Sequence, residues 1–313
     1  MQKDYAIKQS QTTSATETSG ACWHCVFDPS EAELQALKAQ YELPDGYVEA
    51  ALDDHEDARS EALREGADAP GFILVREPYA YQGDTGHRTY ATMPIALILL
   101  ADELVTISRD KPRLMDAYLQ ALDQVETADS LALRIVDRVL DCYTKDIDDM
   151  ADSTHKMEKQ VKNSAKNTLI YEVMSLEKGL VYFNAALTRT KTLVADIRDS
   201  DRYFLAASDA RVLFLLDVKV RQILTTVAST EEILDQYNSA ISSVVGNNLN
   251  LIMKMLTSVS ILLAIPPIIS GIFGQNTWIP WKGQPVYGFW LTLALAAGIS
   301  GAVAWWLHRK DYF

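Results

Sequence analysis

This 313-residue chain has few cysteines, and its sequence shows neither an export signal nor a familiar catalytic motif. Its three cysteines, Cys22, Cys25 and Cys142, are too few for a secreted disulfide scaffold, which needs a larger and even number. Residues 1–20 are rich in Ser, Thr and Gln without an apolar run, so we expect a mobile arm and no signal peptide. The patterns G-x-x-x-x-G-K-[ST], G-x-S-x-G and H-E-x-x-H do not occur, so nothing in the sequence supports an enzyme or a nucleotide-driven pump.

Charge is nearly missing from one end of the chain. Residues 251–313 hold five formal charges with a net of +3, whereas the whole chain carries −13, which leaves −16 on residues 1–250. An acidic body of this kind excludes an electrostatically driven nucleic-acid binder, which needs a basic face. We therefore expect an acidic cytosolic body joined to an almost uncharged tail.

The tail contains two runs with the length of membrane spans, at about 255–274 and 286–307. Neither run contains a charged residue, and about 20 apolar residues suffice to cross a bilayer. A pair of buried core helices is the weaker interpretation, because core helices of that length usually carry polar residues on one side. Aromatic residues flank both runs as two interfacial belts: Trp278, Trp281, Tyr287 and Trp290 in one, and Trp305 and Trp306 in the other.

The distribution of basic residues predicts the orientation. Lys254 precedes the first run, His308-Arg309-Lys310 follows the second, and the connecting loop holds only Lys282. The positive-inside rule then places both termini in the cytoplasm. We expect a multi-pass protein of the plasma (inner) membrane, with the lipid bilayer as one partner.

Residues 21–112 have the pattern of a mixed α/β subdomain. Strands are predicted at 21–27, 71–76, 95–100 and 104–108 from their short apolar, β-prone runs. Ser30 and Glu33 form a capping-box pattern that opens a helix running through Tyr41. Pro44-Asp45-Gly46 is predicted to be a turn.

Residues 113–250 are predicted to be a helical and stalk region, followed by a transmembrane domain at 251–313. No proline occurs between Pro112 and Pro266, and those 153 residues hold only Gly179 and Gly246. Residues 201–265 form one candidate rod, which at 1.5 Å per residue would be roughly 97 Å long. One small body cannot bury the apolar stripe of such a rod, so packing against copies of itself or other long helices is expected.

Two local motifs are interpreted as structural. Cys22 and Cys25 have C-x-x-C spacing, but no second pair exists and the motif falls in a predicted strand, with Cys22 and His24 on one face and Cys25 on the other. The acidic run at residues 53–57 is predicted to be a solvated helix face, although a cation site between subunits is an alternative. The same two interpretations apply to Asp146, Asp148, Asp149 and Asp152.

Residues 250–276 carry a stripe of small or mildly polar residues at helical spacing, with Met253 as the exception. Two interpretations compete: close packing of helices, and the lining of a narrow, mostly uncharged pore. Gly274-Gln275-Asn276 favours the pore, because carbonyls freed at a helix end and an Asn amide would form a polar ring beside water. The stripe consists of Asn250, Met253, Thr257, Ser260, Ala264, Pro267, Gly271 and Gly274.

The sequence resembles the CorA family of magnesium channels, two-span proteins marked by a G-x-N motif. Residues 23–44 are similar to the family's opening strand and helix, and residues 88–109 to its paired strands. Residues 248–276 are similar to its pore helix, and residues 309–313 to its basic-aromatic ending. The resemblance implies an α+β cytoplasmic domain of α/β/α type, joined by a long stalk helix to two C-terminal spans in a funnel-shaped homopentamer.

The resemblance also implies roles for single residues. Gly274, Gln275 and Asn276 would be the selectivity filter, with Asn276 facing the metal. Asn250 would form an inner polar ring, and Met253 and Leu256 the hydrophobic constriction. Asp217 is a candidate for a regulatory metal site between subunits, although Lys219 and Arg221 sit where acids would be preferred. No resident cofactor is expected; Mg²⁺ would be the substrate and a candidate regulator.

The sequence departs from the family pattern and leaves alternatives open. Gln275 replaces the family's usual Met, and the outer loop TWIPWKGQP has no carboxylate. A transporter of Zn²⁺, or of Co²⁺ or Ni²⁺, like the family's ZntB branch, is therefore the second hypothesis. The third is a non-conducting membrane anchor for a cytosolic sensor or interaction domain.

Overall fold

The computed structural model describes residues 2–6, 22–83, 86–122, 125, 127–161, 167–275, 285–310 and 312. Asn276, Trp278, Trp281 and Lys282 lie outside the described residues. The chain divides into two compact units, residues 1–238 and 239–313. The domain boundaries that we expect at residues 20, 112 and 250 stay predictions.

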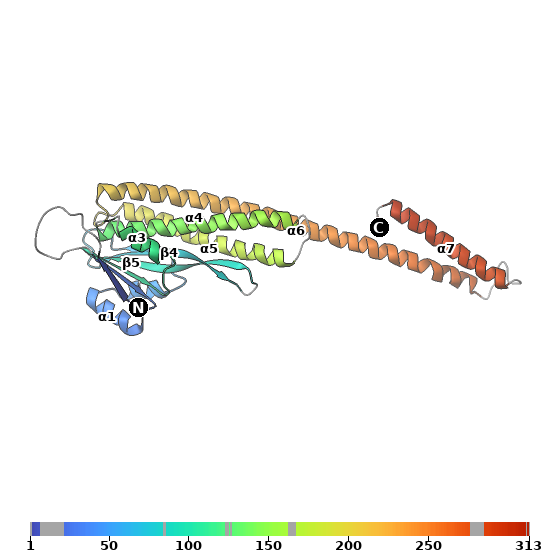
Figure 1. Cartoon of the computed structure of the whole chain (residues 1–313), viewed down its shortest axis with the longest axis horizontal. Coiled ribbons are helices and arrows are strands. Elements are labelled where there is room, and N and C mark those ends of the chain that lie inside the picture. Colours follow the sequence, from blue (N-terminus) through green and yellow to red (C-terminus); the bar gives the residue numbers. More distant parts are fainter. Residues whose placement is uncertain are drawn as a thin grey trace, which may run out of the picture. The chain divides into compact units, whose positions relative to one another are not determined.

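A six-stranded mixed sheet forms the centre of the first unit (Figure 1). The strand order is β1-β2-β6-β5-β4-β3, in which only β2 and β6 are parallel neighbours. The prediction of a mobile arm is wrong for Gln2–Ala6, which forms a strand that pairs with β2. The strands are β1 (Gln2–Ala6), β2 (Cys22–Phe27), β3 (Arg59–Glu61), β4 (Gly71–Gln82), β5 (Arg88–Leu99) and β6 (Glu103–Ser108).

Helices cover both faces of this sheet. On one face, α1 (Glu31–Tyr41) and α2 (Asp45–Leu52) close a core that includes Phe72, Leu74 and Ile98. The other face is covered by α3 (Met115–Leu122), α4 (Ala128–Val161) and α5 (Asn167–Arg198) (Figure 1). Because both faces are covered, β4 is buried continuously from Gly71 to Pro78 instead of alternating between buried and exposed positions.

The start of α1 is as predicted and the start of α2 is not. Ser30 accepts a hydrogen bond from the Glu33 amide, and Glu33 in turn accepts one from the Ser30 amide at 2.8 Å. Pro44 precedes α2 directly, so the predicted turn at residues 44–46 is wrong. A proline is tolerated there because the first turn of a helix leaves its amide hydrogens without helical partners.

The long helix α6 (Ala207–Phe273) has 67 residues. It begins later than the predicted rod and continues through Pro266 and Pro267 to Phe273. The last helix is α7 (Pro285–Arg309). Both helices contain a stretch long and apolar enough to cross a bilayer. The predicted α/β/α body with a long helix and a second apolar helix is confirmed.

Candidate ion pathway

In the second unit, α6 and α7 pack together along one face of each helix. Ser258 and Ile269 of α6 and Ala296 of α7 are buried, whereas most of the apolar side chains around them are exposed. Lys254, Leu262 and Ile265 are partly covered. With 3.6 residues per turn, these α6 positions fall on one side of the helix. That side is the face of α6 that α7 occupies.

The predicted stripe lies on the opposite side of α6. Its positions are centred roughly half a turn from Ser258 and Ile269. All of its members are exposed, with Met253 at 52%, and the neighbouring Leu256 is exposed at 58%. The stripe is therefore available to other helices or to water. Its exposed members are Asn250, Met253, Thr257, Ser260, Ala264, Pro267, Gly271 and Gly274.

Hydroxyl groups on this face hydrogen-bond to their own helix. Thr257 Oγ1 donates to the Met253 carbonyl, and Ser260 Oγ donates to the Leu256 carbonyl, each at 2.8 Å. The surface they present is small and weakly polar. No acidic or basic side chain occurs among the stripe positions.

The C-terminal end of α6 closes with a turn. The Gly274 amide donates to the Ser270 carbonyl at 2.8 Å, and the Gln275 amide donates to the Ile272 carbonyl at 3.4 Å. Both Gly274 and Gln275 are exposed. Because Asn276 is outside the described residues, the Gly274-Gln275-Asn276 filter stays a prediction.

Asp217, the candidate regulatory ligand, lies next to a cation of its own helix. Arg221 Nε is 3.0 Å from Asp217 Oδ2, and the Asp217 side chain is 22% exposed. A metal ion at Asp217 would have to displace this guanidinium. The regulatory role of Asp217 stays a prediction.

Lys219 places a second cation on the same helix. Its Nζ is 2.5 Å from Asp137 Oδ1 and 2.6 Å from Asp141 Oδ1, so it bridges α4 and α6. Among the described residues, no group of three or more His, Cys, Asp or Glu side chains has a metal-binding arrangement.

The acidic runs differ from their predicted form. Residues 53–57 follow α2 as a loop instead of forming a helix face. Asp54 pairs with Arg109, and Asp57 pairs with Arg189 at 3.1 Å. On α4, Asp148 and Asp152 are exposed as predicted, but Asp146 is fully buried.

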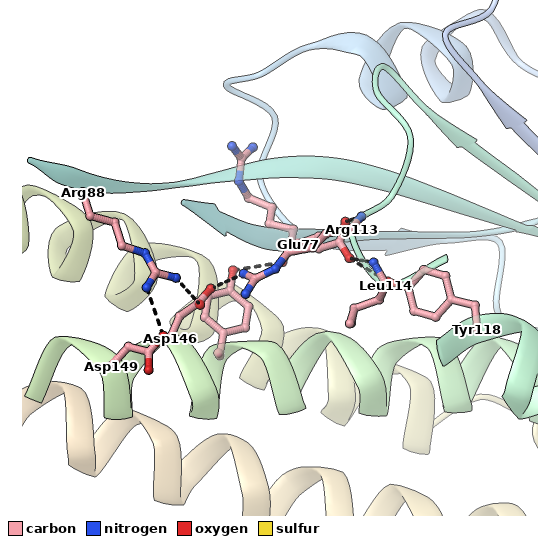
Figure 2. A network of polar contacts seen from close by, with 9 residues as sticks. Glu77, Arg88, Arg113, Leu114, Tyr118, Asp146 and Asp149 are labelled. Carbon is pink, nitrogen blue, oxygen red and sulfur yellow. Dashed lines mark hydrogen bonds and ion pairs between the residues drawn. The ribbon is translucent and has the colours of Figure 1, made fainter. Parts of the chain in front are cut away.

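Asp146 is the buried centre of an ionic network that our sequence reasoning missed, whose other members are partly or well exposed (Figure 2). Its Oδ2 is 2.6 Å from Arg113 Nη1, and its Oδ1 is 3.7 Å from Arg88 Nη2. Arg88 also reaches Asp149 at 3.1 Å. The hydrogen bond that Arg113 donates to the Asp146 carboxylate raises the pKa of Arg113. These carboxylates are neutralised by arginines, so the network holds β5 and the segment before α3 against α4 and is not suited to bind a metal.

Glu77 of β4 is a second buried acid next to this network (Figure 2). It accepts hydrogen bonds from the Arg113 amide at 3.0 Å, the Leu114 amide at 3.2 Å and the Tyr118 hydroxyl at 3.2 Å. Burial nevertheless raises the pKa of Glu77. A sequence signal existed, since the charged pair Arg76-Glu77 interrupts the apolar run of β4, but the partners of Glu77 are more than 30 residues away.

The C-x-x-C motif lies in a strand, as predicted. Cys25 is buried, with its Sγ 3.8 Å from Met115 Sδ, and burial raises its pKa. Cys22 is partly exposed, and its face also carries His24, whose Nδ1 is 2.8 Å from Asp4 Oδ1. A buried thiol of raised pKa is a poor nucleophile and a poor metal ligand, which favours the structural interpretation.

The sequence of the chain matches that of a known protein family. The protein-family model for the CorA-like Mg²⁺ transporter protein family matches residues 18–309. The cobalt/magnesium transport protein CorA of Methanocaldococcus jannaschii is 22% identical over 294 residues, which is 93% of this chain and 90% of that protein.

Solved structures share the fold. The complete structure of the Methanocaldococcus jannaschii CorA magnesium transporter has a TM-score of 0.78 at 21% identity, covering 100% of this chain and 98% of that one. The full-length CmaX protein has a TM-score of 0.69 at 16% identity, with 95% and 90% covered. The ZntB cytoplasmic domain of Vibrio parahaemolyticus has a TM-score of 0.58 at 12% identity, with 76% and 93% covered. The chain therefore belongs to the CorA-like Mg²⁺ transporter family and is a divalent-cation transporter or channel of the membrane.

Proposed function

We propose that the chain assembles as a homopentamer and conducts hydrated Mg²⁺ into the cytoplasm, driven by the membrane potential. The observation that carries this proposal is the stripe on α6. It is exposed, small and without formal charge, and it lies opposite the face that packs on α7. Several copies arranged around an axis would turn these stripes toward one another while α7 stays on the outside.

The chemistry of the stripe suits a hydrated ion. Mg²⁺ loses its water reluctantly and keeps several waters in most protein sites. Neutral hydroxyl, carbonyl and amide oxygens can hold the ion through its water shell. A site that strips a transition metal would instead need His, Cys or Asp ligands at membrane depth.

Within this proposal each part of α6 has one role. Gly274, Gln275 and Asn276 form the outer ring that recognises the hydrated ion, and Asn250 forms an inner polar ring. Met253 and Leu256 form the constriction, which apolar side chains can close by excluding water. Both termini lie in the cytoplasm, in agreement with the basic residues at the ends of the two spans.

Flux into liposomes tests the proposal. Purified protein is reconstituted around a fluorescent Mg²⁺ reporter, and the initial rate of influx is compared with that of empty vesicles. We expect clear influx for the wild type and a severalfold lower rate for Asn276→Ala, because the outer ring loses its amide. Asn247→Ala is the matched control, since Asn247 lies off the stripe, and it should keep the wild-type rate.

Two outcomes contradict the proposal. Wild-type influx equal to that of empty vesicles would favour the membrane-anchored sensor, particularly if the mass of the native complex is that of a monomer or dimer. Flux of Zn²⁺ that exceeds and outcompetes Mg²⁺ flux would favour the transition-metal transporter, the alternative that Gln275 in place of Met supports.

A further inference from the structure

The end of the chain folds back onto α6. The Leu307 carbonyl accepts hydrogen bonds from the Lys310 amide at 3.1 Å and the Tyr312 amide at 3.2 Å, so the chain turns at the end of α7. The Leu307 side chain is only 2% exposed, which anchors this turn. Tyr312 is thereby placed over α6, where the Lys254 Nζ lies 5.5 Å from the centroid of its ring.

Lys254 occupies a sensitive position on α6. It is the only formally charged residue between positions 251 and 275. It follows Met253 directly and precedes Leu256 by two residues, so it lies at the level of the proposed constriction. One residue corresponds to about 100° around a helix, which places Lys254 on the side of α6 that faces α7 and not on the stripe.

The direction of this ammonium matters for a passing cation. The lysine side chain is long and flexible, so its charge can move several ångströms without a change in the backbone. An ammonium turned toward the pore would repel a divalent cation, because like charges would come close together in a narrow passage with apolar walls. The stripe carries no carboxylate that would offset this repulsion.

We propose that Tyr312 is a positioning residue for ion passage, whose ring holds the Lys254 ammonium on the α7 side of α6 and away from the ion path. The attraction is that of a cation to the face of an aromatic ring, which is effective within about 6 Å of the ring centroid. The inference rests on the proposed function, because it assumes that the stripe lines the pore.

A rescue experiment tests the proposal in the same liposome assay, with the full chain. Tyr312→Leu should lower the initial Mg²⁺ influx severalfold, because the ammonium is released. The double variant Tyr312→Leu with Lys254→Met should regain most of the wild-type rate, since no charge remains to be positioned. Tyr312→Phe keeps the ring and should retain most of the flux.

The matched control is Trp305→Leu. Trp305 makes a similar contact with Arg309, whose Cζ is 5.5 Å from the ring centroid, but both residues belong to α7, so this contact holds no charge of α6. This variant should conduct like the wild type. Size-exclusion chromatography of every variant reports whether the assembly is intact.

Each outcome decides the inference. Rescue by Lys254→Met supports it, because a purely structural role of Tyr312 would not be repaired by removing a lysine. Unchanged flux in Tyr312→Leu, or a double variant that stays as slow as Tyr312→Leu, overturns it while leaving the proposed function intact. A wild type without flux would instead reject the proposed function, and the positioning role with it.

Discussion

Glu77 is a buried acid of the sheet whose protonation affects the stability of the fold. Burial raises its pKa above the ordinary value of 4.5, so the folded chain retains a proton that the unfolded chain has already released. Its contribution to stability is therefore fully present below pH 4.5 and is lost as the pH rises through the raised folded-state pKa. The hydrogen bonds from Arg113, Leu114 and Tyr118 limit this loss without reversing it.

The variant Glu77→Gln should lack this pH dependence. We expect the unfolding free energy of the variant to improve relative to the wild type as the pH rises above 4.5, and the difference to level off above the folded-state pKa. Denaturant titrations of both proteins across pH 4–8 measure this difference. A difference that does not change with pH would show that Glu77 titrates alike in the folded and unfolded chains.

Single residues also show where sequence reasoning reaches its limit. Asp146 was predicted to be solvated because its neighbours Asp148, Asp149 and Asp152 make the segment look polar throughout. Its partner Arg113 is 33 residues away, and only the fold brings the two together. By contrast, the pairing of Ser30 with Glu33 is local, so its capping box could be predicted correctly.

At the scale of elements, Gly179 sets how closely α5 can approach the sheet. A Cβ at this position would lie 2.8 Å from Tyr90 Cβ and 3.1 Å from Met150 Cε. Gly179→Ala should therefore destabilise the chain by about 1–2 kcal/mol, because the cost of overpacking exceeds the gain in helix propensity.

Gly46 of α2 provides the matched control for this prediction. A Cβ there would meet no atom within 4 Å, so Gly46→Ala should stabilise the chain by up to about 1 kcal/mol. Thermal unfolding of the two variants in detergent should move the midpoint in opposite directions. A stabilised Gly179→Ala protein would mean that α5 shifts away from Tyr90 at little cost.

The ends of elements were harder to predict than their existence. Strands β2, β4, β5 and β6 and helix α1 all appear where apolar runs and capping predicted them, although β4 and β5 are longer than predicted. The helix α2 was missed because Pro44-Asp45-Gly46 has the composition of a turn, and packing of Tyr47 and Val48 into the core outweighs that local preference. The helix α6 also continues past residue 265, the end of the candidate rod, because local preference alone does not end a helix in an apolar segment.

At the scale of the whole molecule, two serines two positions apart distinguish a pore from a simple anchor. Ser260 is exposed on the stripe, whereas Ser258 is 0% exposed on the face toward α7. In an assembled channel Ser260→Cys should react with Ag⁺ from the water phase and lose most of its Mg²⁺ flux. Ser258→Cys should be far less affected.

The wild type, with its three native cysteines, is the baseline for this comparison. Equal inhibition of both variants, or none in Ser260→Cys, would contradict the assignment of the stripe to the pore.

The architecture itself followed from the sequence, because two long uncharged runs and a stretch without breakers are strong signals. The face of α6 that packs on α7 could not be predicted from the sequence, because it depends on packing that no local pattern encodes.

The tandem proline inside α6 has a consequence for the solvent at that depth. Neither Pro266 nor Pro267 has an amide hydrogen, so the main-chain oxygens of Leu262 and Leu263, four residues earlier, lose the donor that a regular α-helix would supply. Hydrocarbon cannot supply a donor, and an unsatisfied oxygen there costs several kcal/mol. A neighbouring helix, a hydroxyl, a local change in helix pitch or water must supply these donors. If the stripe lines a pore as proposed, pore water can reach this depth and supply them.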